Sequence, residues 1–209
     1  AQAVDRVEWA YQLGSYLVDL PLFEGFWLKV ALNLAHRPYP ESRWGTVLHS
    51  HGSMSLAENL LNQSRKNHRE ELLALVAGLL THLALDRALH PTIEGAVHSH
   101  LRPDEAPAQL HEALENYHAL IWHREHLGNN GLGTKVLREA IAFGPDPDQP
   151  QMDAWLVTAL RQALEDVYGL DPGARAVRRW TDGLWNYRNV LSRFFAKVSI
   201  ASSERLPTQ

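Results

Sequence analysis

The sequence predicts an all-α protein, folded as a single-domain helical bundle. Apolar side chains recur at intervals of three and four residues along most of the chain, which is the spacing of a helix with one buried face. No stretch alternates β-branched with polar residues as a half-buried strand would. Asn130-Gly131, a dipeptide common in hairpin turns, falls between two helical patterns and therefore indicates a helix terminus.

Four helices are predicted in the amino-terminal half of the chain. Ser53 is the expected N-cap of the third. Pro91 is expected to end the fourth, because proline lacks the amide hydrogen that a helix interior needs. A loop containing Pro38, Pro40 and Gly45 is expected between the second and the third. The predicted helices cover residues 5–18, 24–34, 53–62 and 69–90.

Four more helices are predicted in the carboxy-terminal half. Asp104 is the expected cap of the first, with Pro107 in its first turn, and Gly144 ends the second. A proline-rich loop follows Gly144. These helices cover residues 104–127, 134–142, 152–168 and 172–198. We find no internal repeat and no long linker, so residues 1–201 are expected to form one domain and residues 202–209 a disordered tail.

Composition restricts the chemistry that this chain can perform. A net charge of −4, with histidine neutral, argues against binding driven by the nucleic-acid backbone, and we find no strong nucleic-acid signal. The absence of cysteine excludes disulfides, thiolate zinc sites and cysteine nucleophiles. No uninterrupted apolar run approaches the roughly 18 residues of a transmembrane segment, so none is expected. The cytoplasm is slightly favoured, with a removed signal peptide as the alternative.

The central candidate motif places three potential metal ligands, His82, Asp86 and His90, four residues apart. On a helix such residues share one face, with Cβ atoms about 5–6 Å apart. The leucines between them are expected to be buried, so that the polar residues face a cavity or other ligands: Leu83, Leu85 and Leu89. Burying these polar groups without partners costs several kcal/mol, which a metal ion would offset. The alternative is a row of polar residues on the surface.

Three further elements offer ligands of the same kind. His111 and Glu115 form another pair four residues apart, suited to a second ion or to an exposed helix face. Asp19 closes an apolar stretch, either as a ligand or as a residue that ends a helix. His49 and His51 precede the helix expected at Ser53, and either ring could point inward; we favour His49.

The order of these motifs resembles that of the zinc-dependent phospholipase C family, which is related in fold to the fungal single-strand nucleases. The resemblance is strongest to the compact bacterial branch and covers roughly residues 13–193. Four elements carry it, in this order: Leu13-Gly14-Ser15 with Asp19-Leu20-Pro21, Leu48-His49, Gly78-x3-His82-x3-Asp86-x3-His90-Pro91, and His111-x3-Glu115.

The resemblance implies a zinc-dependent phosphoesterase that uses a metal-bound hydroxide. It assigns one zinc to Asp19, His49, His82 and Asp86, and a second to His90, His111 and Glu115. Asp19 and Asp86 are the expected catalytic carboxylates, and Asp86 could bridge to a third ion. The third ion of the family is bound by the N-terminal residue and a nearby histidine, whereas this chain begins Ala1-Gln2-Ala3-Val4 and has no histidine before His36.

The sequence is also compatible with two alternatives to the phosphoesterase. One is a diverged metalloenzyme on the same scaffold that holds zinc, iron or manganese and catalyses a non-hydrolytic reaction. The other is a non-catalytic helical protein stabilised by its metal. The loop expected after Pro91, which would contain His98 and His100, is not strongly apolar. The expected partner is therefore a small-molecule or phosphoester substrate, with lipid, nucleotide and oligomeric state left open.

Overall fold

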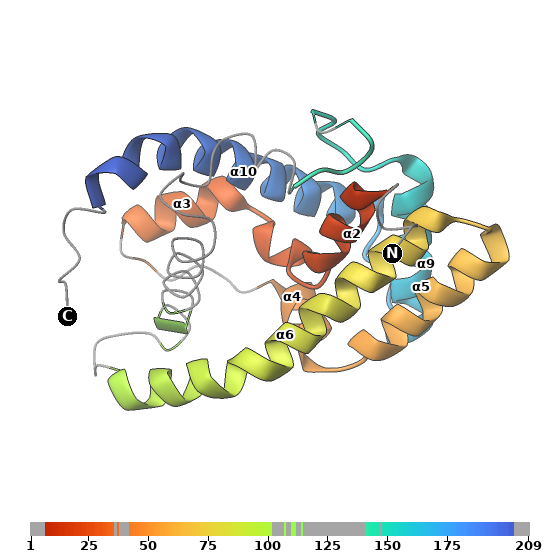
Figure 1. The fold of residues 1–209 in the computed structure, drawn as a ribbon, viewed down its shortest axis with the longest axis horizontal. Helices are drawn as coiled ribbons and strands as arrows, with labels where there is room; N and C mark the ends of the chain where they lie inside the picture. Colours follow the sequence, from red (N-terminus) through yellow and green to blue (C-terminus); the bar gives the residue numbers. More distant parts are fainter. Residues whose placement is uncertain are drawn as a thin grey trace.

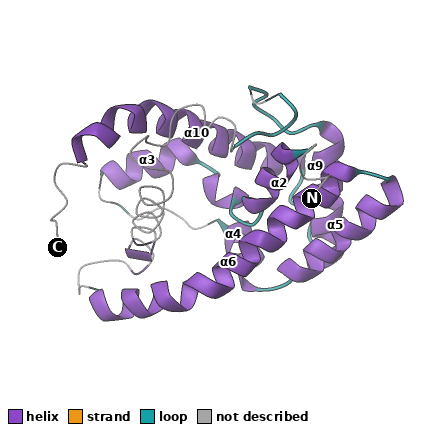
Figure 2. Cartoon of the chain, viewed as in Figure 1, coloured by secondary structure: helices purple, strands orange, loops and turns teal. Residues whose placement is uncertain are grey.

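The computed structural model describes residues 7–35, 37, 42–101, 107, 110–111, 114, 141–146 and 148–202. These residues form seven α-helices and one 3-10 helix, and none of them lies in a β-strand (Figure 1; Figure 2). The all-α prediction is therefore confirmed. In chain order the elements are α2 (Glu8–Ser15), η1 (Leu20–Phe23), α3 (Phe26–Leu34), α4 (Arg43–Ser50), α5 (Ser53–Asn67), α6 (Glu70–His100), α9 (Ala154–Tyr168) and α10 (Ala174–Ser202).

One hydrophobic cluster joins all of these elements except α3. In Figure 1, α6 crosses the molecule along one side, while α3 and α10 lie together on the other. Burial of a leucine side chain contributes about 1.5–3 kcal/mol, so the cluster is the main source of stability in this part of the chain. Fully buried leucines come from six helices: Leu13, Leu48, Leu60, Leu75, Leu160 and Leu184.

Two glycines allow α2 and α6 to cross in backbone contact. A Cβ atom at Gly14 would collide with the carbonyl of Leu75, and one at Gly78 would collide with the carbonyl of Tyr11. The Tyr11 hydroxyl also donates a hydrogen bond to Thr81 Oγ1 at 3.1 Å. This close crossing brings the segment that follows α2 over the middle of α6.

The prediction of a loop around Gly45 was wrong, because this residue lies inside α4. Ser42 is the N-cap, and its Oγ accepts a hydrogen bond from the Gly45 amide at 3.3 Å. A side chain at Gly45 would collide with Leu22, so the glycine lets α4 pack against η1. Pro38 and Pro40, which suggested the loop, lie outside the described residues.

The prediction that Pro91 ends its helix was also wrong. Proline removes one hydrogen bond, but α6 continues for more than two further turns, to His100. Ile93 is buried beyond the proline, and Leu101 N donates to Val97 O at 2.9 Å to close the helix. His98 and His100 therefore lie in the last turn of α6 instead of in a loop.

Other boundaries differ from the predictions by smaller amounts. The first described helix is shorter than expected, and α5 continues to Asn67, where His68 adopts a left-handed conformation with φ 52°. Gly52, with φ 80°, is the N-cap of α5, whereas Ser53 Oγ donates to Leu48 O at 2.6 Å. Both α9 and α10 begin two residues later than predicted.

The two predicted helices between residues 104 and 142 fall mostly outside the described residues. Residues 107, 110, 111 and 114 of the first are described and helical. Asp104, its expected cap, is not among them. Of the second, only Ile141 and Ala142 are described, and they are not helical.

Among the described residues, one helix is long and apolar enough to cross a membrane by length and composition alone, and it is α6. A core helix of a protein without membrane spans passes the same test. The sides of α6 that meet α2 and α5 are packed in the interior. However, only 33% of its most apolar 18-residue window is buried, so much of this apolar helix is exposed.

Candidate metal centre

Asp19 is positioned by the turn that joins α2 to η1. It is the N-cap residue of η1, and its amide donates to the carbonyl of Tyr16 at 3.1 Å. Because α2 crosses α6 in backbone contact, this turn lies above the middle of α6. The Asp19 carboxylate thus meets side chains from both α4 and α6.

His49 lies in the last turn of α4 and is held at both ring nitrogens. Nδ1 lies 2.8 Å from the carbonyl oxygen of Gly45, one helical turn earlier, and Nε2 lies 2.9 Å from Asp19 Oδ1. The first contact fixes the orientation of the ring, as the outer partner of a metal-binding histidine usually does. Because a loop was predicted at Gly45, the contact between its carbonyl oxygen and His49 could not be predicted from the sequence.

His82 of α6 completes the first group of ligands. Its Nδ1 lies 3.8 Å from Asp19 Oδ2, and its ring centroid lies 6.4 Å from that of His49. One donor atom each from Asp19, His49 and His82 fit within 4.8 Å of one another. These three residues come from three separate elements, so the fold, and not a local turn, brings them together.

Asp86 connects this group to the remaining histidines. Its Oδ2 lies 3.0 Å from His82 Nε2, and its Oδ1 lies 3.7 Å from His90 Nε2. The His90 ring lies 5.0 Å from the ring of His111, centroid to centroid. A continuous row of imidazoles and carboxylates therefore runs from Asp19 to His111.

One atom in this row lacks a well-aligned partner. His82 Nε2 is buried, and although Asp86 Oδ2 lies only 3.0 Å away, the described residues offer it no hydrogen bond of acceptable geometry. The short distance alone does not make a hydrogen bond, because hydrogen bonds weaken steeply as the donor angle closes. A ring nitrogen left in this way can coordinate a cation once it has lost its proton.

The electrostatic surroundings of His49 also favour a bound cation. Both of its ring nitrogens face oxygen atoms, which favours the doubly protonated ring. The hydrogen bond to Asp19 is the main cause that raises the pKa of His49 to about 9, against the opposing effect of burial. Without a bound ion, a proton lies between His49 and Asp19, and a metal ion there would replace it.

The pKa values of His82 and Asp86 are also shifted, by less than that of His49, through contacts between oppositely charged groups. Burial acts to lower the pKa of His82, but its contact with Asp86 and the charge of Asp19 raise the pKa overall. Burial acts to raise the pKa of Asp86, but His82 and His90 lower it overall. The row therefore favours charged carboxylates beside cationic partners.

The ligands are accessible from solvent. Side-chain exposure is 15% for His82 and about 30% for Asp19, His49 and Asp86. The prediction that Leu85 and Leu89 are buried was wrong: they are 54% and 53% exposed, because α2 covers only the amino-terminal part of α6. Leu83 packs partly against the core, as expected. A site of this kind leaves room for water or a substrate.

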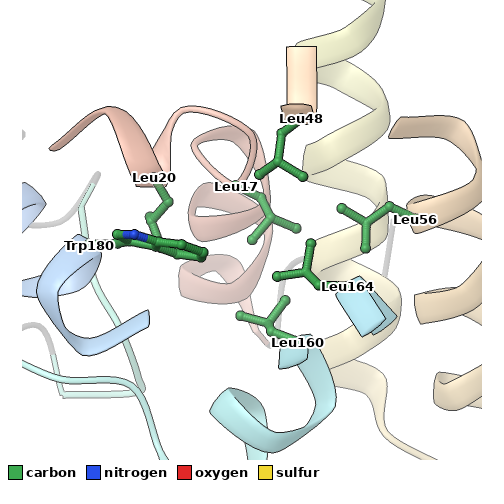
Figure 3. A pocket seen from close by; sticks show the side chains of 7 residues that line it. All are labelled: Leu17, Leu20, Leu48, Leu56, Leu160, Leu164 and Trp180. Carbon is green, nitrogen blue, oxygen red and sulfur yellow. The ribbon is translucent and has the colours of Figure 1, made fainter. Parts of the chain in front are cut away.

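An apolar cavity lies between α4, α5, α9, α10 and the segment of residues 17–20 (Figure 3). Its volume is about 10 Å³, and every lining residue is leucine or tryptophan. Leu20 and Leu48, the neighbours of Asp19 and His49 in sequence, both point into it (Figure 3). A water molecule needs polar partners, so this space belongs to the core and is not a substrate chamber.

The structure thus describes six of the seven predicted metal ligands and places them in one row: Asp19, His49, His82, Asp86, His90 and His111. Glu115 lies outside the described residues. The geometry favours His49 over His51, whose ring lies 5.8 Å from the ring of Tyr168. Tyr16, which no sequence motif indicated, also borders the site: its pKa is raised by burial and by the charge of Asp19.

Comparison with known proteins adds no relative to this description. No family model, curated protein or solved structure matches the chain. The fold and the site define the chain as an all-α protein with a candidate centre of histidines and carboxylates.

Proposed function

We propose that this protein is a metal-dependent hydrolase of phosphate esters, with zinc as its ion and a fold similar to that of the zinc-dependent phospholipase C family. The observation that carries the proposal is the convergence of Asp19, His49 and His82 from three elements. Three nitrogen and oxygen donors with an open side are the ligand set of catalytic zinc sites. A purely structural zinc site would have a fourth protein ligand that closes it.

The proposed ligands fall into two sets, one for each ion. Asp19, His49 and His82 form one set, and Asp86 lies beside the other ring nitrogen of His82, with Oδ2 3.0 Å from Nε2. His90 and His111 lie on the other side of Asp86, and Glu115 is the expected third ligand there. Zinc at such a site supplies Lewis acidity, which makes water more acidic and stabilises negative charge on phosphoryl oxygens.

The position of Asp86 favours a site for two ions over a site for one ion, and sites for two ions are typical of phosphoester hydrolysis. Its two oxygens face His82 and His90 respectively, so one carboxylate serves two neighbouring ligand sets. Paired ions about 3.5–4 Å apart are typical of phosphatases and nucleases, where both the attacking and the leaving oxygen carry charge. Asp19 and Asp86 are accordingly proposed as the catalytic carboxylates.

Metal content and hydrolysis measured on the same preparation test the proposal. The purified chain should hold roughly two equivalents of zinc by elemental mass spectrometry and should hydrolyse a chromogenic phosphodiester. His82→Ala and Asp86→Ala should lose metal and turnover together. His98→Ala is the matched control, because this exposed histidine lies on the same helix beyond the ligand row.

Other outcomes would point to the alternatives. Zinc without turnover, or iron or manganese in its place, would favour a diverged metalloenzyme or a metal-stabilised protein. Absence of metal after gentle purification, or equal metal in all three variants, would contradict the site itself.

A further inference from the structure

The face of α6 that points away from the core is apolar along most of its length. Every three or four residues it presents a leucine, an alanine, a proline or a glycine, and these positions share one side of the helix. We call this row the outer stripe: Leu73, Ala77, Leu80, Ala84, Ala88, Pro91 and Gly95. Leu73 and Leu80 are 42% and 39% exposed, Ala77 is half-buried, and the other four residues are exposed.

Such a face is unusual for a helix on the surface. The solvent side of an amphipathic helix is normally charged or polar, and single exposed leucines need no explanation. Here no charged residue belongs to the outer stripe between Leu73 and Gly95, and Arg87 lies at its margin. Together with the low burial of the helix's apolar window, this continuous row indicates a surface that another molecule covers.

We infer that the outer stripe is the interface of a homodimer in which two copies of α6 pack antiparallel about a two-fold axis at Ala84. A two-fold interface must be self-complementary, because the same surface serves both copies. Residues equally far from Ala84 along the helix then meet across the axis. This register places Leu80 against Ala88 and Leu73 against Gly95, so that each leucine faces a small residue, while Ala77 meets Pro91 and Ala84 meets its own copy.

The polar residues beside the stripe agree with the same register. Glu70 and His98 lie fourteen residues on either side of Ala84, so that a carboxylate of one copy faces an imidazole of the other. Arg87 and Thr81 lie equally far from Ala84 on opposite sides. Arg87 of one copy therefore faces Thr81 of the other copy and not the second Arg87. No pair of like charges opposes the contact.

The composition of the stripe favours a second protein helix over a lipid surface. Five of its seven residues are alanine, proline or glycine, which allow two helix axes to approach to about 8 Å. Membrane-surface helices instead carry bulky apolar residues with lysine or arginine on the flanks. The outer stripe has no aromatic residue, and α6 carries no lysine and a single arginine, Arg87.

The size of the stripe sets the expected strength of the dimer. The outer stripe spans residues 73–95, about 33 Å of helix, and a contact about 10 Å wide would bury roughly 350 Å² per copy. This value is below the roughly 800 Å² of a standard stable interface, so we expect a dimer that dissociates at micromolar concentrations. His82, Asp86 and His90 occupy the opposite side of α6, so the dimer leaves both metal centres uncovered, whether or not they are catalytic.

Sedimentation velocity of the full chain over about 1–100 µM tests the association. Ala84→Glu places two carboxylates at the axis and should raise the dimer dissociation constant at least about tenfold. Ala154→Glu, at an exposed position of α9, should leave it unchanged. Ala84 is exposed, so the variant should keep its circular dichroism and melting temperature.

Cysteine cross-linking tests the register independently of the charge variant. The chain has no cysteine of its own, so Ala84→Cys introduces a single thiol at the axis. Mild oxidation should convert it to a disulfide-linked dimer, whereas Thr158→Cys, exposed on α9, should stay monomeric. A monomer at every concentration, equal cross-linking of the two variants, a dimer that Ala84→Glu does not weaken, or vesicle binding that it abolishes would each overturn the inference.

Discussion

His49 Nε2 lies 2.9 Å from Asp19 Oδ1, although thirty residues and two helices separate them in the chain. The contact depends on two features that no local pattern reveals. The backbone crossing of α2 and α6 determines how far Asp19 lies from α6. The hydrogen-bond contact between Gly45 and His49 orients the imidazole ring. The proton held between these two side chains gives the first prediction.

Zinc affinity should rise with pH. The pKa of His49 is raised to about 9, so below this pH the ring carries a proton that zinc must displace. We expect the apparent association constant to increase about tenfold per pH unit from 6.5 upward and to level off near 9. Titration calorimetry in buffers of different ionisation enthalpy measures the proton released. An affinity independent of pH over this range would contradict the assignment of His49.

The free energy of unfolding of the metal-free protein should fall as the pH rises. The folded state raises the pKa of His49 from 6.5 to about 9, so it binds the proton more tightly than the unfolded state does. This contribution to the free energy of unfolding is complete below pH 6.5 and is lost as the pH rises through about 9. His82, whose pKa is also raised, adds in the same direction. Urea unfolding with a chelator at several pH values measures the loss, and His49→Gln should flatten the profile.

Zinc should stabilise the wild-type protein much more than it stabilises two ligand variants. An ion present at a hundred times its dissociation constant adds about 2.7 kcal/mol to the free energy of unfolding. His82→Ala and Asp86→Ala remove donors from the row and should lose most of this increment. Thermal unfolding with and without zinc provides the comparison. If His98→Ala loses the increment to the same extent, the effect is not specific to the row.

Two glycine-to-alanine changes within α6 should act with opposite sign. A methyl group at Gly78 would collide with the Tyr11 carbonyl, whereas one at Gly95 meets no atom within 4 Å. Overpacking typically costs about 1–3 kcal/mol, so Gly78→Ala should lower the free energy of unfolding and weaken zinc binding. Gly95→Ala should raise it by up to about 1 kcal/mol through helix propensity. Chemical denaturation compares the pair, and equal effects would show that the crossing tolerates a side chain.

The buried guanidinium of Arg188 should be important for stability. It is 1% exposed, donates to the carbonyl of Ile141 at 2.7 Å and lies 3.8 Å above the Trp185 ring. Arg188→Ala would remove these contacts and should lower the free energy of unfolding by about 3 kcal/mol. Asp148, 57% exposed and 3.8 Å from the guanidinium, should matter by less than about 1 kcal/mol when changed to alanine. Comparable losses in both variants would contradict a role based on burial.

The sequence predicted the helical class and the spacing of the ligands on α6, because both depend on local periodicity. It did not predict that α6 passes through Pro91, since the burial of Ile93 beyond the proline depends on the tertiary structure. The exposure of Leu85 was missed for a related reason: apolar spacing does not tell where a neighbouring helix ends. The choice between His49 and His51 required the position of Asp19, which is set by long-range packing.

The backbone contact between α2 and α6 also bears on how the centre could be altered. Side-chain packing adjusts when a core residue changes, but two helices that touch through glycines have little room to move closer together. The spacing of Asp19 and His82 should therefore persist when the ligands themselves are exchanged. Replacing His49 with a carboxylate would shift the donor set toward harder ions such as manganese on an unchanged frame. The chain is thus a suitable starting point for redesigning metal preference one ligand at a time.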